Sequence, residues 1–207
     1  MLLNKDLKEA YKDYKYLLNR GYSRKIALEL ISSRYFLSEL QRLILYRCTH
    51  SDNEISYIQS KISTENNIVV DGFNIAITLI NILDNDNAFL CDDGFIRDLG
   101  LGKKKEDERI LDILILVSEY CVWKKFSCEI ILDSQISNSG KIAEKLRQKH
   151  VTAKTVNKAD KEVIISNKTI ASNDFVILMN SSKIVDLLGK MVKDSYIKLV
   201  KIPEDLS

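Results

Sequence analysis

The sequence contains little of what several common protein classes require. Its 207 residues include one proline and seven glycines, too few for a collagen-like or low-complexity chain. No apolar run approaches the ~18 residues that a membrane-spanning helix needs, so we expect no membrane partner. The opening residues become charged at Lys5 and Asp6, which is too early for a secretory signal, and we expect a cytoplasmic protein.

Histidine and cysteine are also too sparse or too widely spaced for several kinds of active site. The two histidines, His50 and His150, give poor support for a Ser-His-Asp triad or a histidine-based metal site. Successive cysteines lie 43, 30 and 7 positions apart and form no CxxC pair, so we expect reduced and mostly buried thiols. The sequence also contains neither a Walker loop nor a GxGxxG motif.

The charge of the chain is balanced overall but uneven along its length. Hydrophobic residues make up 45% and charged residues 29%, as in an ordinary globular protein, and the net charge is +2. Residues 1–50 carry a net charge of +5, which leaves −3 on the rest. A basic front and an acidic back suit a protein that holds a polyanion at one end and a metal at the other. Chance variation among solvated helix faces explains the asymmetry equally well.

The first sixty residues show only helical patterns. Apolar residues recur at helical spacing from Leu3 onwards, and Gly21 predicts the end of the first helix. Ser38 with Gln41, and Ser51 with Glu54, have the spacing of capping boxes that open two further helices. A polar stretch at 63–67 then breaks the pattern. We therefore predict a helical domain over residues 1–62.

After this break, β-branched runs alternate with helical segments. Such alternation predicts a three-layer α/β/α domain over residues 68–207 with a mostly parallel sheet. Strands are expected near 68–70, 88–91, 128–132, 152–156, 169–171 and 196–202, and helices near 74–84, 106–124, 138–149 and 182–193.

Four of the predicted strands are followed by aspartate. Ligands bind at the carboxyl ends of parallel strands, so these carboxylates are expected to converge on one edge of the sheet. They are Asp71, Asp92 with Asp93, Asp133 and Asp174, and Asp160 lies in a nearby connection. Converging carboxylates repel and favour a hard cation such as Mg²⁺ or Mn²⁺. The chemistry implied is metal-dependent phosphodiester hydrolysis, although a single aspartate after a strand is also common in ordinary turns.

The segment Val69–Ala76, which reads VVDGFNIA, resembles the opening strand of the PIN-like and NYN ribonuclease superfamily. Ser172–Asp174 is similar to a late strand motif of the same proteins, and Ile130–Asp133 to their middle strand. The resemblance implies that Asp71, Asp133, Asp160 and Asp174 are metal ligands, with Asn74 and Ser172 as polar groups of the active site. One of Asp92 and Asp93 is a further candidate ligand.

Over nearly its whole length the chain also resembles a group of uncharacterised, mainly archaeal proteins that join a DUF434 domain to a PIN-like DUF5616 domain. The helical part of this resemblance lies in Tyr16–Tyr22 and Ala27–Leu30. The second part lies in Asp71–Asn74, Cys91–Asp98 and Leu132–Ser134, with Ser139 and Gly140. This resemblance implies a fold with a helical domain followed by a PIN-like domain, and it implies nuclease activity for the second domain.

Basic and aromatic residues in the front part are candidates for binding RNA, because arginine holds phosphates and tyrosine stacks on unpaired bases. The candidates are Arg20, Arg24, Lys25, Arg34, Arg42 and Arg47, with Tyr22 and Tyr35 among them. Lys103, Lys104 and Lys105 form a further basic run that can clamp a substrate over the acids. The alternative is that these residues form an ordinary solvated surface.

Together these patterns favour a metal-dependent ribonuclease that acts in RNA processing or decay. Two other functions stay open at this point. One is a non-catalytic RNA-binding or ribonucleoprotein module, which would keep the metal ligands without cleaving RNA. The other is a metal-dependent phosphatase, which would require a tight, enclosed pocket rather than an open basic groove.

Overall fold

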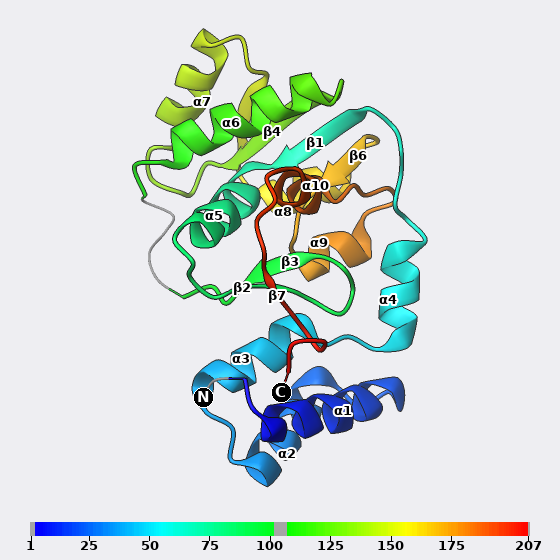
Figure 1. Cartoon of the computed structure of the whole chain (residues 1–207). Helices are drawn as coiled ribbons and strands as arrows, with labels where there is room; N and C mark the ends of the chain where they lie inside the picture. The colour runs from blue at the N-terminus through cyan, green and yellow to red at the C-terminus, as the bar shows by residue number, and fades with distance from the viewer. Residues whose placement is uncertain (1–2, 102–106, 207) are drawn as a thin grey trace. The chain divides into compact units, whose positions relative to one another are not determined.

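The structure is a computed structural model, and it describes residues 3–101 and 107–206 (Figure 1). The described chain forms two compact units. Unit 1 is made from Met1–Ser60, Asn87–Leu101 and Lys198–Ser207, and unit 2 from Lys61–Asp86 and Gly102–Ile197. No described helix combines the length and apolar character needed to cross a membrane.

Unit 1 begins with four helices. They are α1 (Lys5–Asn19), α2 (Arg24–Tyr35), α3 (Glu39–Cys48) and α4 (Asp52–Gln59). Both predicted capping boxes are confirmed, since Ser38 pairs with Gln41 at the start of α3 and Ser51 with Glu54 at the start of α4. Gly21 follows α1 with a φ of 82°, a conformation that glycine adopts without a Cβ clash. No strand occurs among the described residues up to 60.

Unit 1 also contains a small sheet made from two later segments of the chain. Strand β2 (Ala88–Leu90) pairs antiparallel with β3 (Ile96–Asp98) and parallel with β7 (Val200–Lys201). Phe89, Cys91, Leu99, Ile202 and Leu206 from these segments share one hydrophobic core with the helices. The first boundary between the units falls between Ser60 and Lys61, and segments 87–101 and 198–207 belong to the helical unit, because their apolar side chains fill its core.

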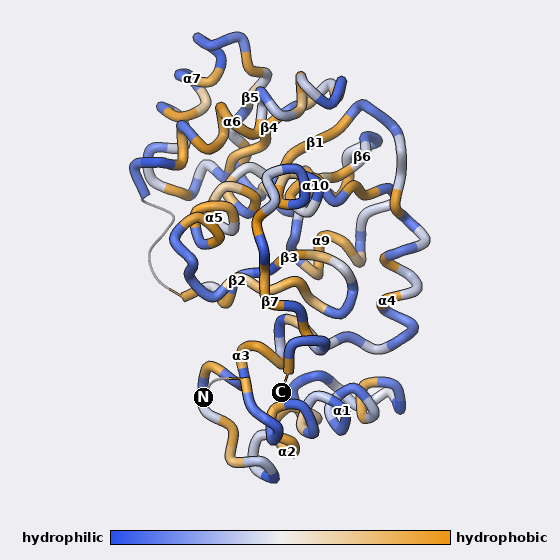
Figure 2. The backbone as a smooth tube through the Cα atoms, viewed as in Figure 1, coloured by the Kyte–Doolittle hydropathy of each residue, from blue (hydrophilic) through white to orange (hydrophobic). Residues whose placement is uncertain are grey.

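Unit 2 contains the parallel sheet that the sequence predicts. Its strands are β1 (Asn67–Asp71), β4 (Ser127–Asp133), β5 (Ala153–Val156) and β6 (Thr169–Ala171). They lie in the order β5-β4-β1-β6, and every neighbouring pair is parallel. Ile68–Val70 in β1 form a continuous, buried apolar run, as expected of a strand that is covered on both faces (Figure 2). The α/β class and the mostly parallel sheet are therefore confirmed.

Six helices connect or flank these strands. They are α5 (Gly72–Leu83), α6 (Ile110–Trp123), α7 (Ser139–Gln148), α8 (Ala159–Ile164), α9 (Phe175–Asn180) and α10 (Leu187–Asp194). Right-handed crossovers from β1 to β4 and on to β5 place α5, α6 and α7 on one face of the sheet, and the return from β5 to β6 places α8 on the other. Contacts of α6 with α5 and α7, and of α8 with α9, agree with this arrangement.

A close approach between α5 and β4 fixes the position of the residues that follow β1. Gly72 starts α5 directly after Asp71, and a Cβ atom added there would lie 2.6 Å from Leu132 Cδ2 and 2.8 Å from Ile130 Cγ2. It would also lie 3.0 Å from the backbone oxygen of Ile131. Only glycine fits without movement of β4, so the entry into α5 is held against the middle of the sheet.

We expect Gly72→Ala to lower the free energy of unfolding by about 1–3 kcal/mol, because the added methyl group overpacks the contact with β4. Urea unfolding followed by circular dichroism measures the change. Gly140→Ala in α7 is the matched control, since nothing lies within 4 Å of a Cβ at that position. It should be neutral or stabilising by up to about 1 kcal/mol. Equal losses for both variants would contradict the packing argument.

Candidate functional site

The parallel sheet brings three of the predicted acidic positions to one edge of unit 2. Asp71 ends β1, Asp133 ends β4, and Ser172–Asp174 follow β6 directly. Strand β1 lies between β4 and β6, and Asp71 pairs with Ile131, so Asp133 stands two residues further along the neighbouring strand. That offset corresponds to ~8 Å between Cα atoms. The carboxyl edge of this sheet is the candidate functional site.

A hydrogen-bond network joins the residues after β1 to those after β6. Ser172 Oγ donates to Asp71 Oδ2 over 2.8 Å, and the backbone N–H of Asn173 donates to Asn74 Oδ1 over 2.8 Å. The backbone N–H of Asp174 donates to Ser172 Oγ over 3.2 Å. Four residue positions singled out from the sequence, 71, 74, 172 and 174, therefore belong to one connected network. Its inner members Asp71 and Ser172 are buried, so the network is a fixed part of the sheet edge.

The electrostatic setting of Asp71 disfavours its charged form. The pKa of Asp71 is raised to about 7, chiefly by burial; the negative charges of Asp160 and Asp174 act in the same direction, and the hydrogen bond from Ser172 opposes them. Asp160 lies in the first turn of α8, and Asp174 caps α9. The carboxylates that act on Asp71 thus come from two different connections of the sheet, and a bound cation would stabilise this arrangement.

The remaining bonds show how the outer acids are oriented. Asp174 Oδ1 accepts hydrogen bonds from the backbone N–H groups of Val176 and Ile177 at the start of α9. Asp133 Oδ1 accepts one from the N–H of Gln135, and its side chain is half-buried. Each acid is therefore held by its own local turn, while oxygen positions on both carboxylates are left for a ligand.

Asp92 and Asp93 do not join this edge, which corrects the expectation that four aspartate-terminated strands share one sheet. The strand before them, β2, belongs to the separate sheet β3-β2-β7 of unit 1. Phe89 of β2 and the following Cys91 pack in the core of unit 1. The segment is therefore apolar like a buried parallel strand, although its neighbours are β3 and β7. No sequence pattern distinguished these two outcomes for a strand of three residues.

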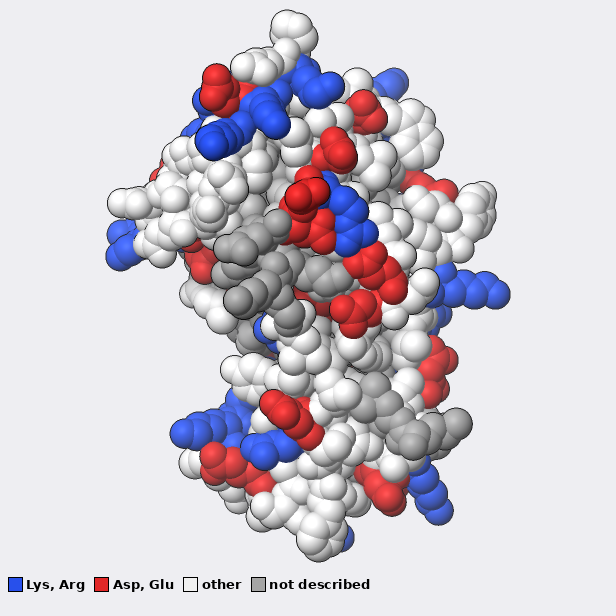
Figure 3. All heavy atoms as spheres, turned by 90° about the vertical axis from the view of Figure 1, so that its left-hand side faces the viewer, with Lys and Arg blue, Asp and Glu red and all other residues white. Residues whose placement is uncertain are grey.

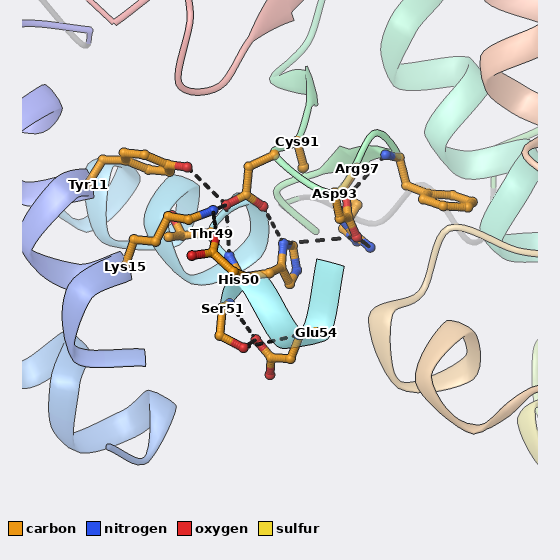
Figure 4. A network of polar contacts seen from close by, with 12 residues as sticks. Tyr11, Lys15, Thr49, His50, Ser51, Glu54, Cys91, Asp93 and Arg97 are labelled. Atoms are coloured by element: carbon orange, nitrogen blue, oxygen red, sulfur yellow. Dashed lines mark hydrogen bonds and ion pairs between the residues drawn. The ribbon is translucent and has the colours of Figure 1, made fainter. Parts of the chain in front are cut away.

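In unit 1, Asp92 and Asp93 meet His50 in a buried polar cluster (Figure 4). Asp92 Oδ1 lies 2.6 Å from His50 Nδ1, and the backbone N–H of His50 donates to Asp92 Oδ2 over 3.0 Å. Tyr11 and Lys15 of α1 also donate to Asp92 Oδ2, over 3.0 and 3.4 Å. The cluster therefore connects α1, the turn between α3 and α4, and the segment after β2.

The second acid of this cluster is held by an arginine. Arg97 donates two hydrogen bonds to Asp93, over 2.8 and 2.5 Å, and both side chains are buried. Burial alone would raise the pKa of Asp93, but Arg97 and, less strongly, His50 hold that pKa below its ordinary value. His50 was considered only as weak support for a triad or a histidine-based metal site, and Arg97 was not a candidate residue. The i, i+4 spacing of Asp93 and Arg97 was the available signal for this pair.

The donor atoms of His50, Asp92 and Asp93 lie within 4.8 Å of one another, the only such group of three among the described residues. One imidazole and two carboxylates match the ligands of zinc. However, Lys15 and Arg97 already supply two positive charges to the two carboxylates. A divalent cation would have to displace them in a buried setting, so we interpret this cluster as a structural ion-pair network.

The predicted RNA-binding residues divide into fixed and exposed groups. Arg24 is fixed, because its guanidinium donates to the backbone oxygens of Tyr46 and Thr49 and to Glu54. Arg47 lies against Gly100, and Arg34 pairs with Asp13 over 3.6 Å. The remaining three, Arg20, Lys25 and Arg42, are exposed. Lys103, Lys104 and Lys105 lie outside the described residues.

Comparison with known proteins places the chain in a family. Residues 60–190 match the family described as "Domain of unknown function (DUF5616)", and residues 6–61 match "Protein of unknown function (DUF434)". The chain belongs to the DUF5616 family and carries the DUF434 region before it. It is 32% identical over 202 residues to "Uncharacterized protein MJ0935" of Methanocaldococcus jannaschii, covering 90% of this chain and 97% of that protein. No solved structure matches the chain.

We expect Asp71→Asn to stabilise the metal-free protein at pH 8. A carboxyl group with a raised pKa in the folded state favours folding below its unfolded pKa of about 4, and this contribution is lost as the pH rises through about 7. The shift corresponds to on the order of 4 kcal/mol at most. Thermal unfolding in EDTA at pH 5 and pH 8 measures the effect, which should be larger at pH 8. Greater stability of the wild type at pH 8 would contradict it.

Arg97→Met should lower the free energy of unfolding by about 3–5 kcal/mol, because it leaves the Asp93 carboxylate buried without its cation. Arg109→Met is the control, since Arg109 makes exposed ion pairs with Asp84 and Asp107. It should cost less than about 1 kcal/mol. Urea unfolding curves of both variants test the difference, and a small effect at Arg97 would show that the cluster contributes little to unit 1.

Proposed function

We propose that this protein is a metal-dependent phosphodiesterase that cleaves RNA, with its active site at the carboxyl edge of the parallel sheet of unit 2. The observation that carries the proposal is the connected network of Asp71, Asn74, Ser172 and Asp174, in which neighbouring carboxylates raise the pKa of Asp71. Ionisation of the buried Asp71 is costly because the charged groups that act on it are carboxylates, and a bound cation removes that cost.

The residues present fit a hard divalent cation. Asp71, Asp133, Asp160 and Asp174 would hold Mg²⁺ or Mn²⁺, both of which prefer oxygen ligands and keep several waters. Such an ion supplies an activated water and neutralises charge on a phosphate group. Because retained waters bridge ion and protein, the carboxylates need not be in direct contact with each other.

The chain's own residues would orient the substrate. Ser172 is fixed between Asp71 and the N–H of Asp174, so its hydroxyl holds the Asp71 carboxylate in one position. Asn74 Oδ1 accepts from the Asn173 backbone, which directs its side-chain amide nitrogen away from that bond. An amide N–H group so placed at the edge of the sheet is a suitable donor to a phosphate oxygen.

Positive charge near the edge favours a polyanionic substrate. Helix α7 follows Asp133 and presents Lys141, Lys145 and Lys149, which are exposed and spaced four residues apart on one face. Lys and Arg side chains gather near the top of the surface shown in Figure 3, at the height that α7 has in Figure 1. A cavity of about 270 Å³ opens beside this helix, and its lining includes Lys141 and Lys145 together with the acids Asp107 and Glu108. Lysines in this arrangement bind phosphates of a nucleic-acid backbone without reading the bases.

The proposal predicts cleavage of RNA that requires a divalent cation. Incubation of labelled single-stranded and structured RNA with Mg²⁺ or Mn²⁺ should give shorter products, and EDTA should abolish them. Asp71→Asn should lower the cleavage rate at least 100-fold, because it removes an anionic ligand on which the other ligands depend. Denaturing gel electrophoresis gives the rates.

Asp194→Asn is the matched control, since Asp194 is an acid of unit 2 that pairs with Lys124 and Tyr120 rather than with the sheet edge. It should cleave RNA at the wild-type rate. Cleavage that persists in EDTA would falsify the metal-dependent mechanism. RNA binding without cleavage by the wild type would favour the RNA-binding module, and hydrolysis of p-nitrophenyl phosphate but not RNA would favour a phosphatase.

A further inference from the structure

Two of the four cysteines face each other at the end of unit 2 where β4 begins. Cys121 lies on the buried face of α6 with Leu114, Val117 and Ser118, which recur at helical spacing. Cys128 is the second residue of β4 and has the same side-chain direction as Ile130 and Leu132, because strand residues alternate between faces. Ile130 and Leu132 face α5, which packs against α6. Helix and strand periodicity thus direct both thiols into the same layer.

The short connection between α6 and β4 keeps the two thiols together. The backbone N–H of Phe126 donates to the backbone oxygen of Cys121 over 2.8 Å, which turns the chain back towards the sheet. Each thiol is then close enough to influence the ionisation of the other, and the Ser118 hydroxyl acts on Cys128 as well. Both cysteines are in the reduced form.

The two thiols differ in reactivity. The neighbouring Cys121 and Ser118 side chains lower the pKa of Cys128, while the neighbouring Cys128 and burial raise the pKa of Cys121. Cys128 is half-buried and Cys121 is buried. A partly accessible thiol with thiolate character beside a second thiol is the arrangement in which oxidation proceeds to a disulfide.

The other two cysteines form a contrasting pair within unit 1. Cys48 ends α3 and Cys91 follows β2, and the Cys91 thiol donates a hydrogen bond to the backbone oxygen of Phe89 over 3.7 Å. Burial raises the pKa of Cys48, and both residues belong to the hydrophobic core. Both cysteines of this pair are buried, and the thiolate form of Cys48 is disfavoured. The pair therefore serves as an internal control whose thiols we expect to resist oxidation.

We propose that Cys121 and Cys128 are a peroxide-sensitive modification site that closes to a reversible disulfide. The Cys128 thiolate attacks hydrogen peroxide, which forms a sulfur–oxygen bond, breaks the oxygen–oxygen bond and gives Cys128 sulfenic acid with hydroxide. The Cys121 sulfur then displaces the sulfenic oxygen, which leaves as water as the sulfur–sulfur bond forms. In total, two thiols and one peroxide give one disulfide and two waters, and a dithiol such as dithiothreitol reverses the change by thiol exchange.

The site is separate from the proposed active site. Cys128 stands five residues before Asp133 on the same strand, a distance of ~16 Å along β4. The disulfide would tie the last turn of α6 to the first residues of β4. It therefore adds a covalent link at the amino edge of the sheet and leaves the network of Asp71 and Ser172 at the carboxyl edge untouched.

Mass spectrometry of the intact, folded chain tests this proposal. The reduced protein is treated briefly with hydrogen peroxide, remaining thiols are alkylated, and the chain is digested with trypsin without reduction. Lys124 and Lys125 lie between the two cysteines, so trypsin separates them unless a disulfide holds the two peptides together. We expect the linked peptide pair ending at Lys124 and Lys141, its disappearance after dithiothreitol, and alkylated Cys48 and Cys91.

Two serine variants distinguish the roles of the thiols. Cys121→Ser should leave Cys128 as a sulfenic acid that dimedone labels, whereas Cys128→Ser should leave Cys121 reduced and unlabelled. Circular dichroism of each variant confirms that it is folded before treatment. Full alkylation of both cysteines in the treated wild type would overturn the proposal. Linkage of Cys48 to Cys91 at the same rate would overturn it too, because accessibility would then not select the site.

Discussion

Parallel pairing of β1 with both β4 and β6 is the constraint on which unit 2 depends. A strand with parallel neighbours on both sides is buried on both faces, which explains the uninterrupted Ile68–Val70 run. The same pairing makes the three strands end at one edge and places Asp71 beside Ser172. Gly72 lets the chain turn into α5 against β4 at once, so Asn74 reaches the Asn173 backbone within the same small region.

The two polar clusters of the protein illustrate two ways of keeping carboxylates in an interior. In unit 1, Asp92 and Asp93 each have a basic side chain in contact. In unit 2, the charged groups that act on Asp71 are other carboxylates, and burial adds to their effect, so the protein alone responds by protonation of Asp71. The first arrangement serves stability. The second keeps an ionised Asp71 unfavourable until a cation binds, which is why it carries the functional proposal.

Long-range pairing decides what the sequence could and could not predict. The capping boxes of α3 and α4, the parallel strands and the acids after β1 and β4 follow from local periodicity and were predicted. Strand β3 was missed because three residues are too few to show an alternating pattern. Strand β2 was placed in the wrong sheet because the local sequence of a strand does not determine which strands pair with it. His50 was misread for the same reason, since its partners Asp92 and Asp93 lie more than forty positions away.

The construction of unit 1 from three separate stretches has a consequence for how the chain is made. Strand β7 and the core residues Ile202 and Leu206 are synthesised last, although the helices that they complete are synthesised first. During translation, the core of α1 to α4 therefore lacks the side chains of Ile202 and Leu206 until all of unit 2 has been synthesised. The helical unit reaches its final form only after Ile202 and Leu206 have joined its core, so its folding depends on a segment made after all of unit 2.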